Sequence, residues 1–461
     1  MTREFINTAL RDAAAEQNTQ STDAFRSAMR ELHAADIAKH LVTLTRHDAA
    51  KALLALSDRR QAEIFGHLRP HIQVELARIF NREQLATLIT AMSHDERVDL
   101  FKQLTAEEQS TLLPALAHAE REDIRRLGAY PEGTAGSIMT SDYATLTSEV
   151  LASDALEKLR QEAPDKETIY DIYVIDEDHK LIGVLSLREL LVAQASTRVG
   201  DMMRRKPVFA RSGASTDTIA EIIAEYDLLA LPVVDESGML VGIVTVDDAM
   251  DVTSQSHGRS VAQFGGNASI DGGPDLSLRS SSFWNLFKTR VFWLAILTVF
   301  GIVTSSIVAG QEALLEEIVI LAAFIAPIVD AGGNTGSQSA TLVIRAMALG
   351  EVRLRWRDLW FVIKREIPVV LSLGIVIGIL EIILAYFSKG IGIEVLLTVG
   401  ISMAVCMIIG GLIGALLPFI ARRIGTDPAT LSSPMITSIM DLLGVMIYFG
   451  LAWLFMGHLM V

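Results

Sequence analysis

Apolar residues recur at a fixed spacing in the first part of the chain. From residue 56 to residue 116 a large apolar residue returns every twelve positions, as Leu56, Leu68, Phe80, Met92, Leu104 and Leu116. Twelve residues make about two and a half helical turns and a short link. The pattern therefore predicts a stack of short helices, an α-superhelix of the repeat kind, over residues 47–132, after a polar helical lead-in at 1–46.

Capping residues between these helices support the prediction. Ser93 with Glu96, and Thr105 with Glu108, match the capping box, in which two side chains each satisfy a free backbone N–H group at a helix start. We expect a helix to begin directly after Ser93 and another directly after Thr105.

An internal repeat follows. The segment IYVIDEDHKLIGVLSLRELLVA (172–193) aligns with LPVVDESGMLVGIVTVDDAMDV (231–252), and each copy is predicted to form a strand, an Asp-centred turn, a strand and a helix, preceded by a helix at 153–161 or 216–226. The repeat resembles a tandem pair of cystathionine-β-synthase-type (CBS) domains, at 133–199 and 200–254. Such pairs form regulatory modules, some of which bind adenine nucleotides such as ATP; the sequence leaves open whether this pair does.

The last part of the chain is strongly apolar. After a Gly- and Ser-rich linker or connecting helix at 255–282, a transmembrane domain is predicted at 283–461, with five hydrophobic stretches long enough to cross about 30 Å of hydrocarbon. These lie at about 284–309, 313–345, 361–387, 393–421 and 432–457. The predicted fold is thus multi-domain: an α-helical superhelical N domain, an α/β CBS pair and an all-α membrane domain of five helices.

The second hydrophobic stretch carries an unusual polar segment, APIVDAGGNTGSQSATLVIRA (326–346). Its proline and paired glycines predict a broken helix, which lipid does not tolerate because hydrocarbon cannot satisfy free backbone groups. We therefore expect a backbone break that lines a permeation path, formed by Pro327, Gly332, Gly333 and Gly336.

Charge is distributed unevenly along the chain. The whole sequence has 40 Lys and Arg against 55 Asp and Glu, and residues 281–461 hold 11 of each, so the acidic excess of 15 lies entirely before residue 281. An acidic soluble region argues against nucleic acid or anionic lipid as its partner and favours cations. The single Cys406 excludes an intrachain disulfide, and the first residues show no apolar core of a signal peptide.

Loop charges predict the orientation in the membrane. Arginine and lysine residues gather before the first stretch and between the second and third and the fourth and fifth, whereas the opposite loops carry Glu312, Glu316, Glu317 and Glu394 against Lys389. Because positive loops stay in the cytosol, we expect a protein of the cell (inner) membrane with a cytosolic N-terminus and an outside C-terminus.

Two carboxylates lie deep in the predicted membrane spans. Asp441 is about 13 Å along the last helix and has no Lys or Arg in that span, and Asp330 lies beside the GGNTG segment. Magnesium prefers oxygen ligands and loses its water reluctantly, so paired carboxylates suit a hydrated divalent ion. One chain supplies one Asp441, and a two-fold homodimer is the simplest way to present a pair. A protonated or hydrogen-bonded structural aspartate is the alternative.

Together, the acidic helical array, the CBS pair, the five spans, GGNTGSQSATLVIRA and the late DP…D pattern (Asp427, Pro428, Asp441) resemble the MgtE family of magnesium transporters. The resemblance implies a homodimer with a central magnesium pore in which Asp441 binds the permeating ion, with Thr437, Asp330 and Asn334 along the route. It also implies closure by cytosolic magnesium bound to acids of the soluble domains and pore mouth: Glu63, Asp95, Asp99, Asp217, Asp227, Asp248, Asp251 and Asp427. A solvated helix surface, or acids at a helix start, is the plainer interpretation of these acids.

One segment departs from the family pattern. Members commonly carry several acids directly after the second CBS copy, where this chain has Ser254, Gln255, Ser256, His257, Gly258, Arg259 and Ser260. We expect magnesium to close this protein less completely.

Two other functions compete with a magnesium channel. A proton-coupled transporter of Mn, Co or Ni would use Asp330 and Asp441 as proton carriers, and a membrane-tethered nucleotide sensor would conduct nothing. An enzyme is not expected, because the sequence has no Gly-rich phosphate loop, no His/Cys metal spacing and no nucleophile motif.

Overall fold

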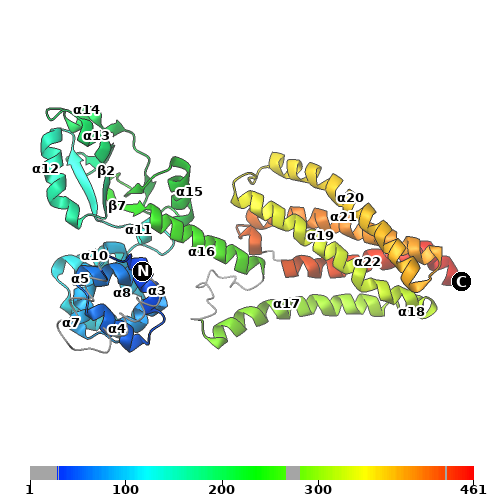
Figure 1. The fold of residues 1–461 in the computed structure, drawn as a ribbon. Coiled ribbons are helices and arrows are strands. Elements are labelled where there is room, and N and C mark those ends of the chain that lie inside the picture. Colours follow the sequence, from blue (N-terminus) through cyan, green and yellow to red (C-terminus); the bar gives the residue numbers. More distant parts are fainter. Residues whose placement is uncertain (1–28, 30, 266–280, 431–432, 461) are drawn as a thin grey trace. The chain divides into compact units, whose positions relative to one another are not determined.

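The computed structural model describes residues 29, 31–265, 281–430 and 433–460. By its internal contacts the chain divides into a unit that ends at Ser254 and a unit that begins at Gln255, and each is described by itself. Figure 1 shows short helices and small sheets in the first unit and long helices in the second.

The first unit begins with the predicted helical array. Its helices are α3 (Ala34–Leu41), α4 (Arg46–Leu54), α5 (Asp58–Gly66), α6 (Pro70–Ala77), α7 (Arg82–Ala91), α8 (His94–Gln103), α9 (Ala106–Leu112), η1 (Leu113–Ala115) and α10 (His118–Gly128). Odd-numbered helices pack on odd-numbered ones and even-numbered on even-numbered ones, which gives two layers that wind together. All six apolar residues of the twelve-residue period are buried, so this period is confirmed as the core of the array.

Helix capping agrees with the sequence at one predicted box and differs at the other. Thr105 and Glu108 form the capping box of α9. Ser93 precedes α8 but makes no hydrogen bond to the helix backbone, so the predicted box with Glu96 is wrong. The Glu96 carboxylate instead packs over Gly66, where an added Cβ would lie 2.1 Å from its Oε1. Glu96 is therefore part of the packing between helices.

Two small sheets follow the array. The first has the order β1-β2-β3-β4 and the second β5-β6-β7, with the first pair of each parallel and the second pair antiparallel. Asp176 and Asp235 occupy matching turns, and in each case Oδ1 accepts two backbone N–H groups. This confirms the predicted strand, Asp-centred turn and strand in both copies. The elements are α11 (Ala135–Ile138), β1 (Tyr143–Thr147), α12 (Ala152–Glu162), η2 (Ala163–Asp165), β2 (Thr168–Ile175), β3 (Leu181–Ser186), α13 (Leu187–Val192), α14 (Val199–Met202), β4 (Arg204–Arg205), β5 (Ala210–Arg211), α15 (Thr216–Tyr226), β6 (Ala230–Val234) and β7 (Leu240–Thr245).

The segment expected to be a linker begins as a helix. α16 runs without interruption over Val246–Phe264, so the last helix of the second copy continues for ten residues past the predicted boundary at 254. Residues 266–280 of the predicted linker lie outside the described residues.

The described residues of the second unit include five helices long and apolar enough to cross a membrane, as predicted. α19, α21 and α22 pack closely on one another, α20 packs along α21, and α17 packs along α22. The elements are α17 (Phe283–Ala309), α18 (Glu312–Glu317), η3 (Val319–Leu321), α19 (Ala322–Ala348), α20 (Trp356–Lys389), α21 (Ile393–Arg423), η4 (Pro428–Thr430), α22 (Ser433–Met456) and η5 (Gly457–Met460).

The predicted break in the second hydrophobic stretch is wrong. α19 is one continuous helix through Pro327 and the GGNTG segment, and the interruption lies earlier, between α18 and α19. The glycines serve close packing instead: a Cβ on Gly410 would lie 2.2 Å from the Gly332 carbonyl oxygen, and one on Gly414 would lie 2.0 Å from that of Gly336. Small residues four apart on both helices let the backbones of α19 and α21 touch.

Candidate functional site

Asp441 lies on α22 at the edge of a cavity. The side chain is half-buried, and the cavity has a volume of about 310 Å³ and is open on one side. α17, α19 and α22 line this Asp441 cavity with Gly301, Thr304, Ser305, Val308, Ile325, Ala326, Val329, Asp441 and Val445. The carboxylate is therefore not sealed in a closed core, because the cavity beside it is open.

Asp330 and Asn334 lie one turn apart on α19. The Asn334 Nδ2 donates a hydrogen bond of 2.9 Å to Asp330 Oδ2, and both residues are exposed on the helix surface. Asp330 is close enough to Asp441 for the two charges to repel. In the ranges that the structure describes, neither acid has an ion pair with a basic side chain. The structure thus brings the two membrane acids near each other without a compensating cation.

Thr437 lies one turn before Asp441, and its Oγ1 donates to the Ser433 carbonyl at 3.0 Å. Gly333 packs against it, since an added Cβ would lie 3.3 Å from Thr437 Cγ2. Pro327 is exposed near the start of α19, whereas Gly332 and Gly336 are buried against α21. Apart from Pro327, the predicted pore residues therefore divide into a polar set that is exposed or half-buried and three buried glycines that pack the helices together.

Six carboxylates of the first unit form an acid cluster. α8 supplies three of them, the residue before β2 supplies one and the start of α16 supplies two: Asp95, Glu96, Asp99, Glu167, Asp247 and Asp248. One carboxylate oxygen, Asp95 Oδ1, is buried without a hydrogen-bond donor. The cluster combines acids of the helical array with acids of the CBS-like repeats, and these acids repel one another when ionised.

Burial and mutual repulsion raise the pKa of five acids of the cluster, namely Asp95, Glu96, Asp99, Glu167 and Asp248. Burial, with repulsion from Asp95, raises the pKa of Glu96 to about 8 and that of Asp248 to about 8. Asp99 and Glu167 lie at the rim and keep contact with solvent, and the same two causes raise their pKa to about 6 and about 7. Ionised together, these groups repel one another, and a bound cation would relieve that repulsion.

Only part of the predicted regulatory set lies in this cluster. Asp95, Asp99 and Asp248 belong to it. Glu63 is exposed and pairs with Arg60 at 2.7 Å. The other four predicted acids lie elsewhere and are exposed: Asp217 in the first turn of α15, Asp227 as the left-handed residue that ends α15, Asp251 on α16 and Asp427 before η4, where its Oδ1 accepts the Ala429 N–H.

The sequence analysis missed two members of the acid cluster, Glu96 and Glu167. Glu96 was assigned to a capping box, and nothing near Glu167 in the sequence marks it as a ligand. Asp247 follows β7 beside Asp248, and that pair of acids was the available signal. Among the described residues no three His, Cys, Asp or Glu side chains already converge as a metal site. The cluster is a concentration of charge that a hydrated ion can bridge, without a preformed chelating geometry.

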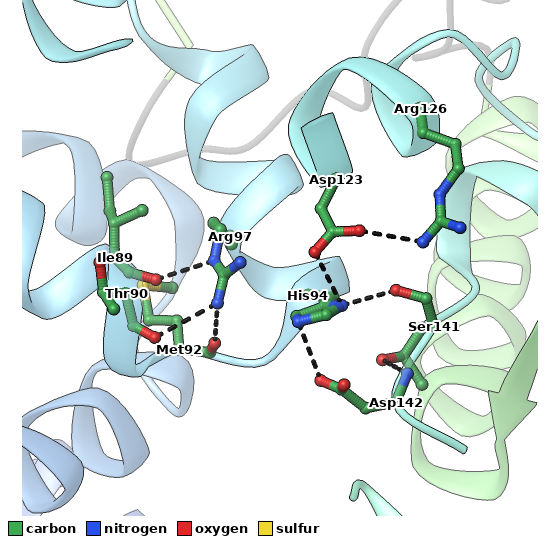
Figure 2. A network of polar contacts seen from close by, with 10 residues as sticks. Ile89, Thr90, Met92, His94, Arg97, Asp123, Arg126, Ser141 and Asp142 are labelled. Atoms are coloured by element: carbon green, nitrogen blue, oxygen red, sulfur yellow. Dashed lines mark hydrogen bonds and ion pairs between the residues drawn. The ribbon is translucent and has the colours of Figure 1, made fainter. Parts of the chain in front are cut away.

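A polar network next to the cluster fixes the position of α8. His94 contacts Asp123 of α10 at 3.4 Å, Asp142 at 3.3 Å and the Ser141 hydroxyl at 2.5 Å (Figure 2). Arg97, which is 4% exposed, donates to three backbone carbonyls at the end of α7, those of Ile89, Thr90 and Met92. His94 thus ties the array to the segment before β1, and Arg97 ties α8 to α7, so the helix that carries Asp95 and Asp99 is held in place.

The raised pKa values predict how stability depends on pH. Without metal, the folded protein holds more protons on these acids than the unfolded chain between about pH 4 and pH 8, so stability should fall as pH rises through that range. Magnesium should therefore raise the melting temperature more at pH 8 than at pH 6. Scanning calorimetry of the full chain tests this.

Two variants of the acid cluster and one control sharpen that test. Asp95→Asn or Asp248→Asn should raise the metal-free melting temperature at pH 8 and reduce the magnesium shift. Glu177→Gln, at an exposed acid outside the cluster and outside the proposed regulatory sites, should change neither. Equal pH dependence in all three variants and the unsubstituted protein would show that the cluster does not set stability.

Comparisons with known proteins agree with this architecture. Residues 325–451 match the family model MgtE, divalent cation transporter; residues 32–133 match the MgtE intracellular N domain; residues 135–196 and 199–254 each match the CBS domain. The chain is 36% identical to the magnesium transporter MgtE of Thermus thermophilus over 97% of this chain and 98% of that protein. It is 31% identical to the magnesium transporter MgtE of Bacillus subtilis over 94% of each.

A solved structure matches the first unit. It is the cytosolic domain of the Mg²⁺ channel MgtE in complex with ATP, with a TM-score of 0.50 and 36% identity over 53% of this chain and 99% of that one. Five membrane-length helices and the matched transporter model define an integral membrane protein of the divalent cation transporter class. The chain belongs to the MgtE family, as its sequence motifs predicted.

Proposed function

We propose that this protein carries Mg²⁺ through the membrane along a path lined by Asp441. The observation that supports this most strongly is the half-buried Asp441 carboxylate on an open cavity, in a chain whose relatives are named magnesium transporters. Magnesium keeps most of its water when bound, and a carboxylate can accept hydrogen bonds from that water. The transported ion is the substrate, and the relatives' names describe transporters, a class that is not enzymatic.

A polar stripe on α19 supports a homodimer as the working form. Asp330, Asn334, Gln338, Thr341 and Arg345 follow one another three or four residues apart and are all exposed in the single chain. Contact with lipid disfavours such a stripe, because the transfer of a polar group into hydrocarbon costs several kcal/mol of free energy. A second copy related by a two-fold axis would cover the stripe and bring two Asp441 cavities to one aqueous path.

The acid cluster supports regulation by magnesium. In this proposal the helical array and the CBS pair lie in the cytosol, in keeping with the loop charges, and the outside face carries the C-terminus. At high cytosolic Mg²⁺, bound ions neutralise the acid cluster and the pore is closed. Five exposed acids contribute further Mg²⁺ sites: Asp217, Asp227, Asp251, Asp427 and Glu63. At low Mg²⁺ the carboxylates repel and the pore opens. ATP binding by the CBS pair is part of the proposal, supported by the ATP complex of the matched domain.

The acid-poor half of α16 predicts weaker closure. Residues 254–260 are helical and contain no carboxylate. Fewer ions can bridge this segment, so we expect open-channel activity to persist at low-millimolar cytosolic Mg²⁺. Patch recordings at stepped Mg²⁺ concentrations measure this, and Ser254→Asp with Ser256→Asp should tighten closure. Complete closure of the unsubstituted protein in that range would refute the prediction.

Uptake by cells that lack their own magnesium transporters tests the proposed function. We expect the chain to restore Mg²⁺ uptake and growth, and the uptake to continue when the proton gradient is collapsed at constant membrane potential. Uptake of Mn, Co or Ni that stops with the proton gradient would instead favour the coupled transporter. The absence of any metal uptake would favour the membrane-tethered nucleotide sensor.

A further inference from the structure

One hydroxyl on α17 differs from the others on that helix. In a membrane helix a Ser or Thr hydroxyl usually donates to the carbonyl one turn earlier, because hydrocarbon offers it no other acceptor. Four hydroxyls of α17 do so, with distances of 2.7–3.1 Å: Thr289, Thr298, Thr304 and Ser306. Ser305 has no such bond in the described structure, so its hydroxyl is free to bind another partner.

Ser305 lines the Asp441 cavity. Among the nine residues that line it, Thr304, Ser305 and Asp441 alone have polar side chains. Gly301, one turn before Ser305, leaves open space, since an added Cβ would contact nothing within 4 Å. At about 30 Å³ per water, an ion with six waters occupies about 180 Å³, which fits the cavity of about 310 Å³.

We propose that the Ser305 hydroxyl, which α17 contributes to the cavity, is a further binding group for the hydrated ion. It donates to or accepts from a water of the ion's shell while Asp441 accepts from others, because Mg²⁺ exchanges that shell reluctantly. α17 is then part of the permeation path as well as a lipid-facing helix. This inference rests on the proposed function and identifies a residue of the same site.

Cysteine labelling tests the inference directly. In the full chain with Cys406→Ser, reconstituted in liposomes, Ser305→Cys is expected to react with a membrane-impermeant, positively charged methanethiosulfonate and to be protected by Mg²⁺. The neighbouring Ser306 does not line the Asp441 cavity, so Ser306→Cys is expected to be at least tenfold slower and unprotected. Ser305→Cys reacting no faster than Ser306→Cys, or without protection, overturns the inference.

Transport measurements give a second, independent readout. Ser305→Ala should raise the apparent KM for Mg²⁺ about two- to tenfold, which is the range that the loss of one neutral hydrogen bond gives. Ser305→Thr keeps the hydroxyl, so its KM should be close to that of the unsubstituted protein. Ser306→Ala should leave the KM unchanged. An unchanged KM in Ser305→Ala counts against the inference. If the unsubstituted protein carries no Mg²⁺, the proposed function itself fails; if it carries Mg²⁺ and Ser305→Cys is inert, this inference alone fails.

Discussion

Asp441→Asn is expected to reduce Mg²⁺ uptake by about 100-fold without unfolding the protein. A hydrogen bond to a charged group contributes about 1.5–3 kcal/mol, and in the proposed homodimer both protomers lose one charged acceptor. The loss of at least about 3 kcal/mol corresponds to about 100-fold in binding the ion. Isotope-free uptake with a magnesium-sensitive dye in transport-deficient cells measures the rate.

Two further variants separate loss of charge from loss of fold. Asp441→Glu keeps the carboxylate and should retain part of the uptake. Asp358→Asn removes an acid of α20 outside the cavity, where the carboxylate accepts the Arg353 N–H, and should transport normally. Asp441→Asn transport above a tenth of the unsubstituted rate would show that the carboxylate is not the main binding group.

Gly414→Ala is expected to have the second large effect, on the folded membrane unit. The new Cβ would lie 2.0 Å from the carbonyl oxygen of Gly336 and 2.6 Å from its carbon, both backbone atoms that cannot rotate away. α19 and α21 must therefore separate, at a cost of at least about 1–3 kcal/mol for overpacking. The melting temperature in detergent and the yield of monodisperse protein from size-exclusion chromatography should both fall.

Gly450→Ala is the matched control for that substitution. Gly450 lies on α22, and an added Cβ would contact nothing within 4 Å. Alanine in a helix interior is favoured over glycine by about 0.5–1 kcal/mol, so this variant should be as stable as the unsubstituted protein or slightly more. Equal stability of Gly414→Ala and Gly450→Ala would contradict the close contact between α19 and α21.

Local patterns in the sequence were sufficient for most of the fold. The twelve-residue period predicted the buried positions from Leu56 to Leu116 because each short helix buries its last apolar residue before the next cap. The aligned aspartates Asp176 and Asp235 predicted both turns because a carboxylate that accepts two backbone N–H groups fixes the turn by itself. Membrane helices were predicted from length and hydropathy, which hydrocarbon thickness imposes.

The GGNTG segment shows where local patterns fail. Glycine in a membrane helix can mark a break or a close contact between helices, and the sequence of one helix does not distinguish the two. The distinguishing signal lies on another helix: Gly410 and Gly414 have the same four-residue spacing as Gly332 and Gly336. The two glycine pairs considered together would have predicted that α19 packs closely on α21.

The candidate sites were less predictable because their members are distant in sequence. The acid cluster combines α8, the residue before β2 and the start of α16, and only the packing of the array on the repeats brings Glu167 to Asp95. The sequence did not mark Ser305 as a site residue, because the hydroxyl of a serine in an apolar helix usually donates to the backbone of the same helix. Its free hydroxyl became evident only when the cavity beside Asp441 was described.

Flux into liposomes that contain only the purified protein is the most direct test of an Asp441-lined magnesium path. With an inside-negative membrane potential and no pH gradient, Mg²⁺ should enter vesicles with the unsubstituted protein and should not enter vesicles with Asp441→Asn. No entry in either, or entry that requires an imposed proton gradient, would contradict the account.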